Sequence, residues 1–176
     1  MNTLELGILD LIQKIRCPLL DFIMKYITHL GDGGLIWILI GVSLFIFKKT
    51  RKVGLMILVG LVFHLVLLNH GLKPLVHRIR PCYLKEIDML IKKPTDYSFP
   101  SGHTAAGCIA IMVFYLSKYQ KAFIVSLILT IIIAFSRMYL YVHYPTDILV
   151  GALLGLLFGY IGFKLVNYFY NKYEMS

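Results

Sequence analysis

The sequence contains few charged residues and few cysteines. Only 15% of its 176 residues are Asp, Glu, Lys or Arg, whereas 59% are hydrophobic and the mean hydropathy is +0.76. This composition excludes an ordinary soluble globular domain. The three cysteines have no CxxC spacing, so they predict neither a metal site nor a disulfide framework. Internal repeats, low-complexity tracts and long polar linkers are also absent, which favours a single domain.

Long apolar runs without Asp, Glu, Lys or Arg make up most of the chain instead. Each run is typical of a membrane-spanning helix, and neighbouring Lys and Tyr side chains extend the shorter runs into the membrane interface. The sequence therefore predicts an all-α integral membrane protein with five transmembrane helices. The runs are residues 33–47, 53–72, 101–117, 122–136 and 148–163.

Residues 1–30 have apolar side chains at helical spacing, but charged residues and Pro18 interrupt them. This pattern predicts an amphipathic helix that lies in the membrane interface. The segment lacks the basic start, unbroken apolar core and cleavage site of a removable signal peptide. We expect this interfacial segment to be followed by a helical domain at 31–170 and a short tail at 171–176. Asp32, where the first span begins, is predicted to be a helix N-cap.

The unusual polar residues cluster in three segments at the ends of predicted spans. Residues 73–80 follow the second span, residues 100–103 open the third, and residues 136–147 join the fourth to the fifth. Because successive spans cross the membrane in opposite directions, all three segments must share one face. The net charge of +9 lies mainly in short connections, where lipid headgroups are the nearest anions, so nucleic acid is not the expected partner.

The third segment contains Ser136-Arg137, then five residues, His143, then three residues, Asp147. A carboxylate that holds one ring nitrogen of a histidine leaves the other nitrogen unprotonated and aimed, as a nucleophile or base requires. Pro145 suits a first helical turn, which would place Asp147 within reach of His143. The alternative is a His–Asp pair that only ties a loop to a helix cap.

The second segment, Pro100-Ser101-Gly102-His103, has the features of a phosphate-binding helix N-terminus. Ser101 is a good N-cap, and Gly102 lets an anion approach the free backbone amides closely. His103 would add a second imidazole to such a site. The alternative is a capped helix with an interfacial histidine.

Three cations are expected on the same face as the two histidines: Lys73, Arg80 and Arg137. An arginine binds phosphate oxygens through two parallel hydrogen bonds, and a lysine supplies a compact charge, so the three could hold a phosphoryl group. The alternative is ordinary binding of lipid headgroups by cations next to the membrane.

Taken together, the three segments resemble the signature of the type 2 phosphatidic acid phosphatase family, which also includes soluble vanadium haloperoxidases. The matching pattern is Lys73-x6-Arg80-Pro81, Pro100-Ser101-Gly102-His103 and Ser136-Arg137-x5-His143-x3-Asp147, in which every position is filled. The resemblance covers about residues 31–162.

This resemblance implies a phosphatase that uses no metal and no cofactor. In the family pattern His143 attacks phosphorus and Asp147 orients it, while His103 protonates the leaving oxygen and then activates water. The resemblance also implies which residues surround the phosphate: Lys73, Arg80, Ser101, Gly102, Arg137 and His143.

The five-span architecture resembles the short bacterial undecaprenyl pyrophosphate phosphatases, which makes that lipid the expected substrate. Phosphatidylglycerol phosphate, phosphatidic acid and diacylglycerol pyrophosphate are the alternatives. The resemblance implies a bacterial inner membrane, with the active site at its outer face. Two non-enzymatic alternatives are a small transporter, whose inverted repeat is missing, and an inactive lipid-binding protein, which would be expected to lack a signature residue.

Overall fold

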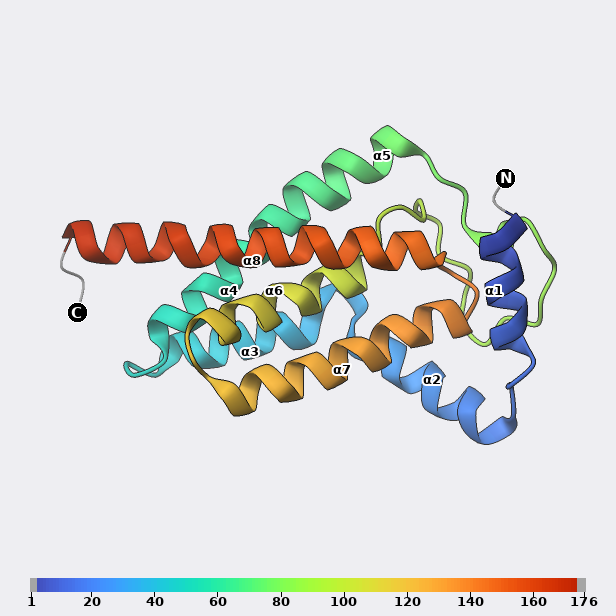
Figure 1. Ribbon diagram of the computed structural model, residues 1–176, viewed down its shortest axis with the longest axis horizontal. Coiled ribbons are helices and arrows are strands. Elements are labelled where there is room, and N and C mark those ends of the chain that lie inside the picture. Colours follow the sequence, from blue (N-terminus) through green and yellow to red (C-terminus); the bar gives the residue numbers. More distant parts are fainter. Residues whose placement is uncertain (1–2, 174–176) are drawn as a thin grey trace.

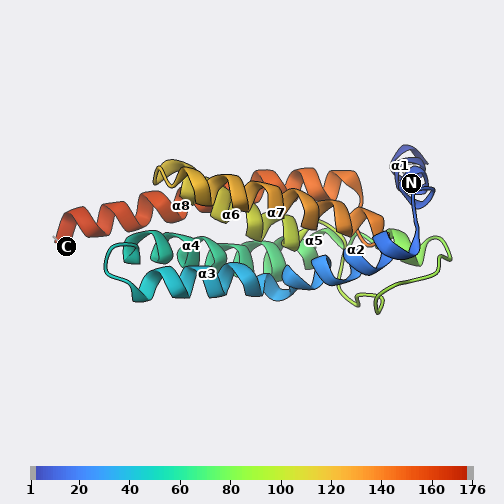
Figure 2. The same cartoon turned by 90° about the horizontal axis from the view of Figure 1, so that it is seen from below.

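The computed structural model describes residues 3–173 as a bundle of helices that run alongside one another (Figure 1). No strand occurs within these residues, which confirms the all-helical prediction. Figure 2 shows the bundle from below, with α3 and α4 in one layer and α6, α7 and α8 in the other. The main helices are α3 (Leu35–Ile46), α4 (Arg51–Phe63), α6 (Gly102–Leu116), α7 (Gln120–Tyr139) and α8 (Pro145–Tyr173).

The helical path of α4 extends beyond Phe63. It continues into a π-helix at His64–Leu72 and then into the short helix α5 (Lys73–Val76). A π-helix is rare and is often found at a functional site. This continuous helical path carries Lys73 to the end of the bundle at which Arg80, His103 and His143 lie.

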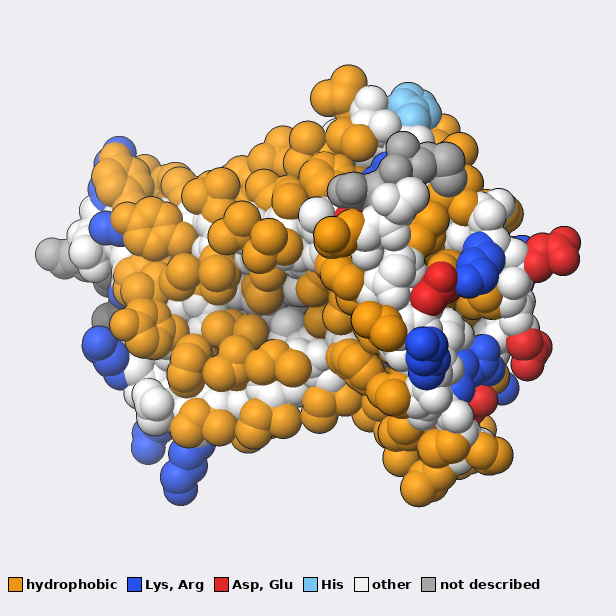
Figure 3. Space-filling view, turned by 45° about the vertical axis from the view of Figure 1, so that its right-hand side comes forward, with side chains coloured by type: hydrophobic (Ala, Val, Ile, Leu, Met, Phe, Trp, Pro, Cys, Tyr) orange, Lys and Arg blue, Asp and Glu red, His pale blue; other side chains and the backbone are white. Residues whose placement is uncertain are grey.

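Hydrophobic side chains cover the sides of the bundle, while charged side chains gather at its two ends (Figure 3). Exposed residues of this apolar belt include Val62, Ile128, Leu149 and Leu153. Side chains of this kind are stable when they face lipid tails, which agrees with the prediction of a membrane protein.

Three segments of the described chain are long and apolar enough to cross a membrane: Arg51–Tyr83, Gln120–Tyr139 and Pro145–Tyr173. A fourth would arise if Pro18–Leu30 and Asp32–Ile46, which are bent by 43°, form one span. Helix α6 is apolar but shorter. The count of five transmembrane helices therefore stays a prediction.

Glycines on α8 allow α6 to pack closely against it. A Cβ atom added to Gly151 would lie 2.5 Å from the carbonyl oxygen of Ser101, and one added to Gly159 would lie 2.8 Å from that of Ile109. Small residues are the usual means by which membrane helices approach one another. This packing brings the start of α6 beside the start of α8, where the Ser101 amide donates to the Asp147 carbonyl oxygen at 3.0 Å.

The N-terminal segment forms two helices, α1 (Thr3–Gln13) and α2 (Pro18–Leu30), with Pro18 at the first turn of the second. Helix α1 crosses the polar end of the bundle, and α2 lies along α7 (Figure 1). At the other terminus, α8 continues to Tyr173, so the predicted tail at 171–176 begins as helix. Its last three residues lie outside the described part of the chain.

Candidate active site

The polar side chains of the three predicted segments meet at one end of the bundle. A cavity of about 470 Å³ at this end is lined by residues of all three. The prediction that the segments share one face of the molecule is therefore confirmed. Members of the predicted site that line the cavity are Lys73, Arg80, His103, Arg137 and His143.

His143 lies in the turn between α7 and α8 and is 1% exposed. Its Nδ1 is 3.3 Å from Oδ2 of Asp147, which lies in the first turn of α8. The prediction that Asp147 lies within reach of His143 is therefore confirmed. Its Nε2 is 3.1 Å from Nη1 of Arg80. Since a guanidinium only donates hydrogen bonds, Nε2 must accept and the ring proton must lie on Nδ1. The Nε2 lone pair therefore faces the cations.

The charge state of His143 follows from the same surroundings. Burial lowers the pKa of His143 well below 6.5, and the nearby Arg80 and Arg137 guanidinium groups lower it further. The imidazole is therefore neutral near pH 7, as a nucleophile requires.

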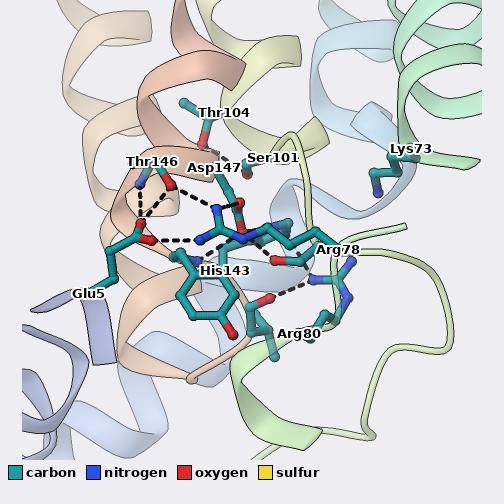
Figure 4. A network of polar contacts seen from close by, with 12 residues as sticks. Glu5, Lys73, Arg78, Arg80, Ser101, Thr104, His143, Thr146 and Asp147 are labelled. Carbon is teal, nitrogen blue, oxygen red and sulfur yellow. Dashed lines mark hydrogen bonds and ion pairs between the residues drawn. The ribbon is translucent and has the colours of Figure 1, made fainter. Parts of the chain in front are cut away.

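Asp147 is held by more partners than the sequence suggested. Its Oδ2 accepts hydrogen bonds from the backbone amide of Tyr144 at 2.9 Å and from the hydroxyl of Ser98. Its Oδ1 accepts from Nη1 of Arg78 at 2.6 Å (Figure 4). Sequence reasoning missed Ser98, for which no pattern exists. It assigned no role to Arg78.

The start of α6 has no side-chain cap hydrogen bond. Ser101 is the N-cap residue, but its hydroxyl makes no cap hydrogen bond and instead accepts from Thr104 Oγ1 at 3.1 Å. A Cβ atom on Gly102 would lie 3.2 Å from His64 Nε2, so this position is crowded. The first-turn amides that lack a side-chain cap are suited to an anion.

Two of the three predicted cations are paired with a carboxylate from the long loop. Arg80 Nη2 lies 2.8 Å from Oδ1 of Asp96, and Lys73 forms an ion pair with the other carboxylate oxygen. Burial raises the pKa of Asp96, but Arg80 and Lys73 outweigh it and hold the value at about 2. Asp96 therefore places a negative charge beside two of the cations that line this cavity. Sequence analysis assigned no role to Asp96.

Arg137 differs from the other two cations. It is 4% exposed, and its Nη1 donates to Thr28 Oγ1 at 2.6 Å. Within residues 3–173 its Nε has no hydrogen-bond partner, and the guanidinium forms no ion pair. A buried cation of this kind is stabilised when an anion enters the cavity.

His103 also has a carboxylate partner, which the sequence did not reveal. Its Nε2 is 3.0 Å from Oδ1 of Asp32, whose Oδ2 is 2.7 Å from Nδ1 of His29. The prediction that Asp32 is a helix N-cap is wrong, because Gly34 occupies the N-cap of α3 and the Asp32 side chain turns to the two histidines. Gly31 permits this arrangement, since a Cβ atom there would lie 2.5 Å from His103 Cδ2.

A second cavity, of about 540 Å³, adjoins the first and shares Lys73, Asp96 and His103 with it. Its other polar lining residues include His64 and Asn69, which both belong to the π-helix. Together the two cavities offer space beyond that needed for one phosphate group.

Comparison with known proteins identifies the family. The PAP2 superfamily profile matches residues 52–171. The chain is 32% identical over 146 residues to an undecaprenyl-diphosphatase of Sulfolobus acidocaldarius, covering 82% of this chain and 70% of that protein. It is 35% identical over 156 residues to phosphatidylglycerophosphatase B of Bacillus subtilis, covering 81% and 73%.

Solved structures agree with this assignment. The crystal structure of Aquifex aeolicus LpxE aligns with a TM-score of 0.73 at 30% identity, covering 92% of this chain and 95% of that one. The transmembrane PAP2 type phosphatidylglycerolphosphate phosphatase from Bacillus subtilis aligns with a TM-score of 0.71 at 34% identity, covering 98% and 88%. The chain therefore belongs to the PAP2 superfamily of membrane lipid phosphatases.

Proposed function

We propose that this protein removes a phosphate group from a membrane lipid through a phosphohistidine intermediate on His143, without a metal ion. The observation that carries the proposal is the orientation of the buried His143 ring, with Nδ1 toward Asp147 and Nε2 toward Arg80 at a cavity lined by cations. A neutral, oriented imidazole beside fixed positive charges fits nucleophilic attack on a phosphoryl group.

In the proposed first step, the Nε2 lone pair of His143 forms a bond to phosphorus while the bond from phosphorus to the lipid oxygen breaks. His103 gives its proton to that leaving oxygen. Asp147 stabilises the positive charge that develops on the imidazole, and the phosphate displaces the Asp96 carboxylate from Lys73. The cations and the amides at the start of α6 stabilise the charge on the transferred group.

In the second step, His103 accepts a proton from water, whose oxygen attacks phosphorus. The bond between phosphorus and Nε2 of His143 breaks, inorganic phosphate leaves, and the imidazole returns to its neutral state. His103 thus acts first as an acid and then as a base.

Undecaprenyl pyrophosphate is the proposed substrate. Support comes from the undecaprenyl-diphosphatase of Sulfolobus acidocaldarius and from BcrC of Bacillus subtilis, an undecaprenyl-diphosphatase that is 30% identical over 149 residues. The second cavity offers space for a second phosphate group. Phosphatidylglycerol phosphate is the leading alternative, because the phosphatidylglycerophosphatase B of Bacillus subtilis is 35% identical.

The decisive experiment measures phosphate release by purified wild type and His143→Ala protein in detergent with EDTA. The lipid panel is undecaprenyl pyrophosphate, phosphatidylglycerol phosphate, phosphatidic acid and diacylglycerol pyrophosphate. We expect EDTA-resistant release that requires His143, fastest with undecaprenyl pyrophosphate. Release by His143→Ala protein would contradict the intermediate, and loss of release in EDTA would contradict the metal-free mechanism.

The proposed topology has five membrane helices, with the N-terminal helix in the interface and the active site at the outer face of a bacterial inner membrane. This orientation puts the Lys and Arg residues of the α3–α4 and α6–α7 turns, at the opposite end of the bundle, in the cytoplasm. A membrane-impermeant maleimide applied to intact cells should label the exposed Cys17 but not a Lys49→Cys site in a Cys17→Ser background. The reverse labelling would contradict the orientation.

A further inference from the structure

A chain of short contacts connects the N-terminal helix to the His143–Asp147 pair. Glu5 on α1 is 3% exposed, and its Oε2 lies 2.6 Å from Nη2 of Arg78. Nη1 of the same guanidinium lies 2.6 Å from Oδ1 of Asp147. Figure 4 shows Arg78 between the two carboxylates, with His143 beside them. One arginine therefore bridges α1 and the residue that orients the candidate nucleophile.

The position of Arg78 is fixed from several directions. Besides its two carboxylate partners, it donates to Thr146 Oγ1 at 2.7 Å. Its guanidinium carbon lies 3.9 Å from the centre of the Tyr144 ring, at cation–π distance. A planar guanidinium held in this way has little freedom to turn.

Glu5 also makes direct contact with the first turn of α8. Its Oε1 accepts hydrogen bonds from the backbone amide of Thr146 at 3.1 Å and from the Thr146 hydroxyl at 2.6 Å. An acidic side chain is favourable at a helix N-terminus, where backbone amides lack helical partners. Glu5 thus holds the turn that carries Asp147 as well as the arginine bound to it.

We propose that Glu5 is a positioning residue for the His143–Asp147 pair and acts on it through Arg78. This inference rests on the proposed function of His143. Glu5 compensates part of the charge of Arg78. Without it, the full charge of Arg78 would bear on Asp147 and weaken the hold of this carboxylate on the Nδ1 proton of His143.

The competing explanation is that Glu5 only docks α1 onto the bundle. Asp10, on the same helix, provides a matched control for docking. Its Oδ1 accepts from the Tyr141 hydroxyl at 2.8 Å and lies 2.7 Å from Lys85 Nζ. Neither of these partners forms a hydrogen bond or ion pair with Asp147 or His143 within the described part of the chain.

The test compares Glu5→Gln with Asp10→Asn, using the lipid that wild type hydrolyses fastest. Glutamine keeps the size of Glu5 and an acceptor for Thr146, but it removes the charge that faces Arg78. We expect kcat to fall about 10- to 100-fold with KM unchanged, since small displacements of reacting groups are costly. Asp10→Asn protein should keep a kcat close to that of wild type, although it loses a comparable contact of α1.

A double-mutant cycle separates action through Arg78 from independent effects. In an Arg78→Gln background, the Glu5→Gln change should have little further effect on kcat, because residues that act as one unit are not additive. Arg78→Lys is a second variant in case Glu5→Gln protein does not fold. It keeps the charge but not the planar fork, and it should lose kcat in the same way.

The outcomes distinguish this inference from the proposed function. If wild type hydrolyses lipid and Glu5→Gln behaves like Asp10→Asn, or if the cycle is additive, the positioning role is wrong while the phosphatase assignment stands. Full activity of Arg78→Lys protein would also overturn it. Wild type that releases no phosphate from any lipid of the panel would reject the proposed function, and the inference with it.

Discussion

The two histidine–carboxylate pairs of this protein differ in how tightly they are held. The side chains of His143 and Asp147 are 1% and 0% exposed, and Asp147 is fixed by Arg78, Ser98 and a backbone amide. In the other pair, the side chains of His103 and Asp32 are 16% and 54% exposed. The first pair is buried and held by several hydrogen bonds, while the second reaches solvent, mainly at Asp32.

This difference matches the chemistry that each pair would perform. A nucleophile must be aimed at phosphorus and kept free of a proton, which burial and fixed hydrogen bonds achieve. A general acid and base must exchange protons with the leaving group and with water, so it needs access to both. Substitutions in the two pairs should therefore have unequal effects.

The largest effect is expected for Asp147→Asn. Asparagine cannot support the Nδ1–H tautomer of His143 as a carboxylate does, so kcat should fall on the order of 10⁴-fold while lipid binding persists. Steady-state phosphate release with the fastest lipid measures the change. A loss no greater than that of Asp32→Asn protein would remove the distinction between the pairs.

His103→Gln should slow turnover about 10²–10⁴-fold, the usual contribution of a positioned acid or base. Because water activation also fails, the phosphohistidine should accumulate after rapid mixing with ³²P-labelled lipid. Acid quenching would destroy this linkage, so the enzyme should be trapped in alkaline denaturant. Absence of labelled protein, with turnover unchanged, would contradict the acid–base role of His103.

Asp32→Asn should have a smaller effect, a loss in kcat of about tenfold, because its exposed carboxylate can be replaced in part by water. The measurement is kcat on the same lipid. His29→Gln is the control, since it removes the other partner of Asp32 without touching His103. A loss as large as that of Asp147→Asn would show that both pairs are equally dependent on their carboxylates.

Lys73→Ala should mainly weaken phosphate binding, and Asp96→Asn should strengthen it. In the proposed mechanism Lys73 binds the phosphate, and the Asp96 carboxylate, which forms an ion pair with Lys73, competes with it. Inhibition by inorganic phosphate measures both effects, with a higher inhibition constant for Lys73→Ala and a lower one for Asp96→Asn. Changes in the same direction would contradict competition at this site.

The smallest perturbation is a change of pH. Burial and then Arg80 lower the pKa of His143 well below 6.5, so its ring should still be neutral at pH 6.5, where an exposed histidine is half protonated. The contribution of this neutral ring to stability is complete above pH 6.5 and is lost as the pH falls below that value. Imidazole NMR signals, assigned by comparison with His143→Ala protein, would reveal a protonated His143 if this is wrong.

Much of the site could be predicted from the sequence. The order and spacing of three segments, with the parity of successive spans, placed Lys73, His103 and His143 on one face. The local spacing of His143 and Asp147 around Pro145 set their contact, because the start of a helix fixes geometry over a few residues.

What the sequence alone determined was an all-helical apolar chain whose signature residues meet at one end, because hydropathy and short-range spacing are properties of consecutive residues. Only the tertiary structure decided which carboxylate serves which cation or imidazole. Asp32 lies 71 positions from His103, and Glu5 lies 73 positions from Arg78. Neither periodicity nor a motif in the sequence indicates the distant partner of a single acidic residue, because the contact forms only when distant helices pack together.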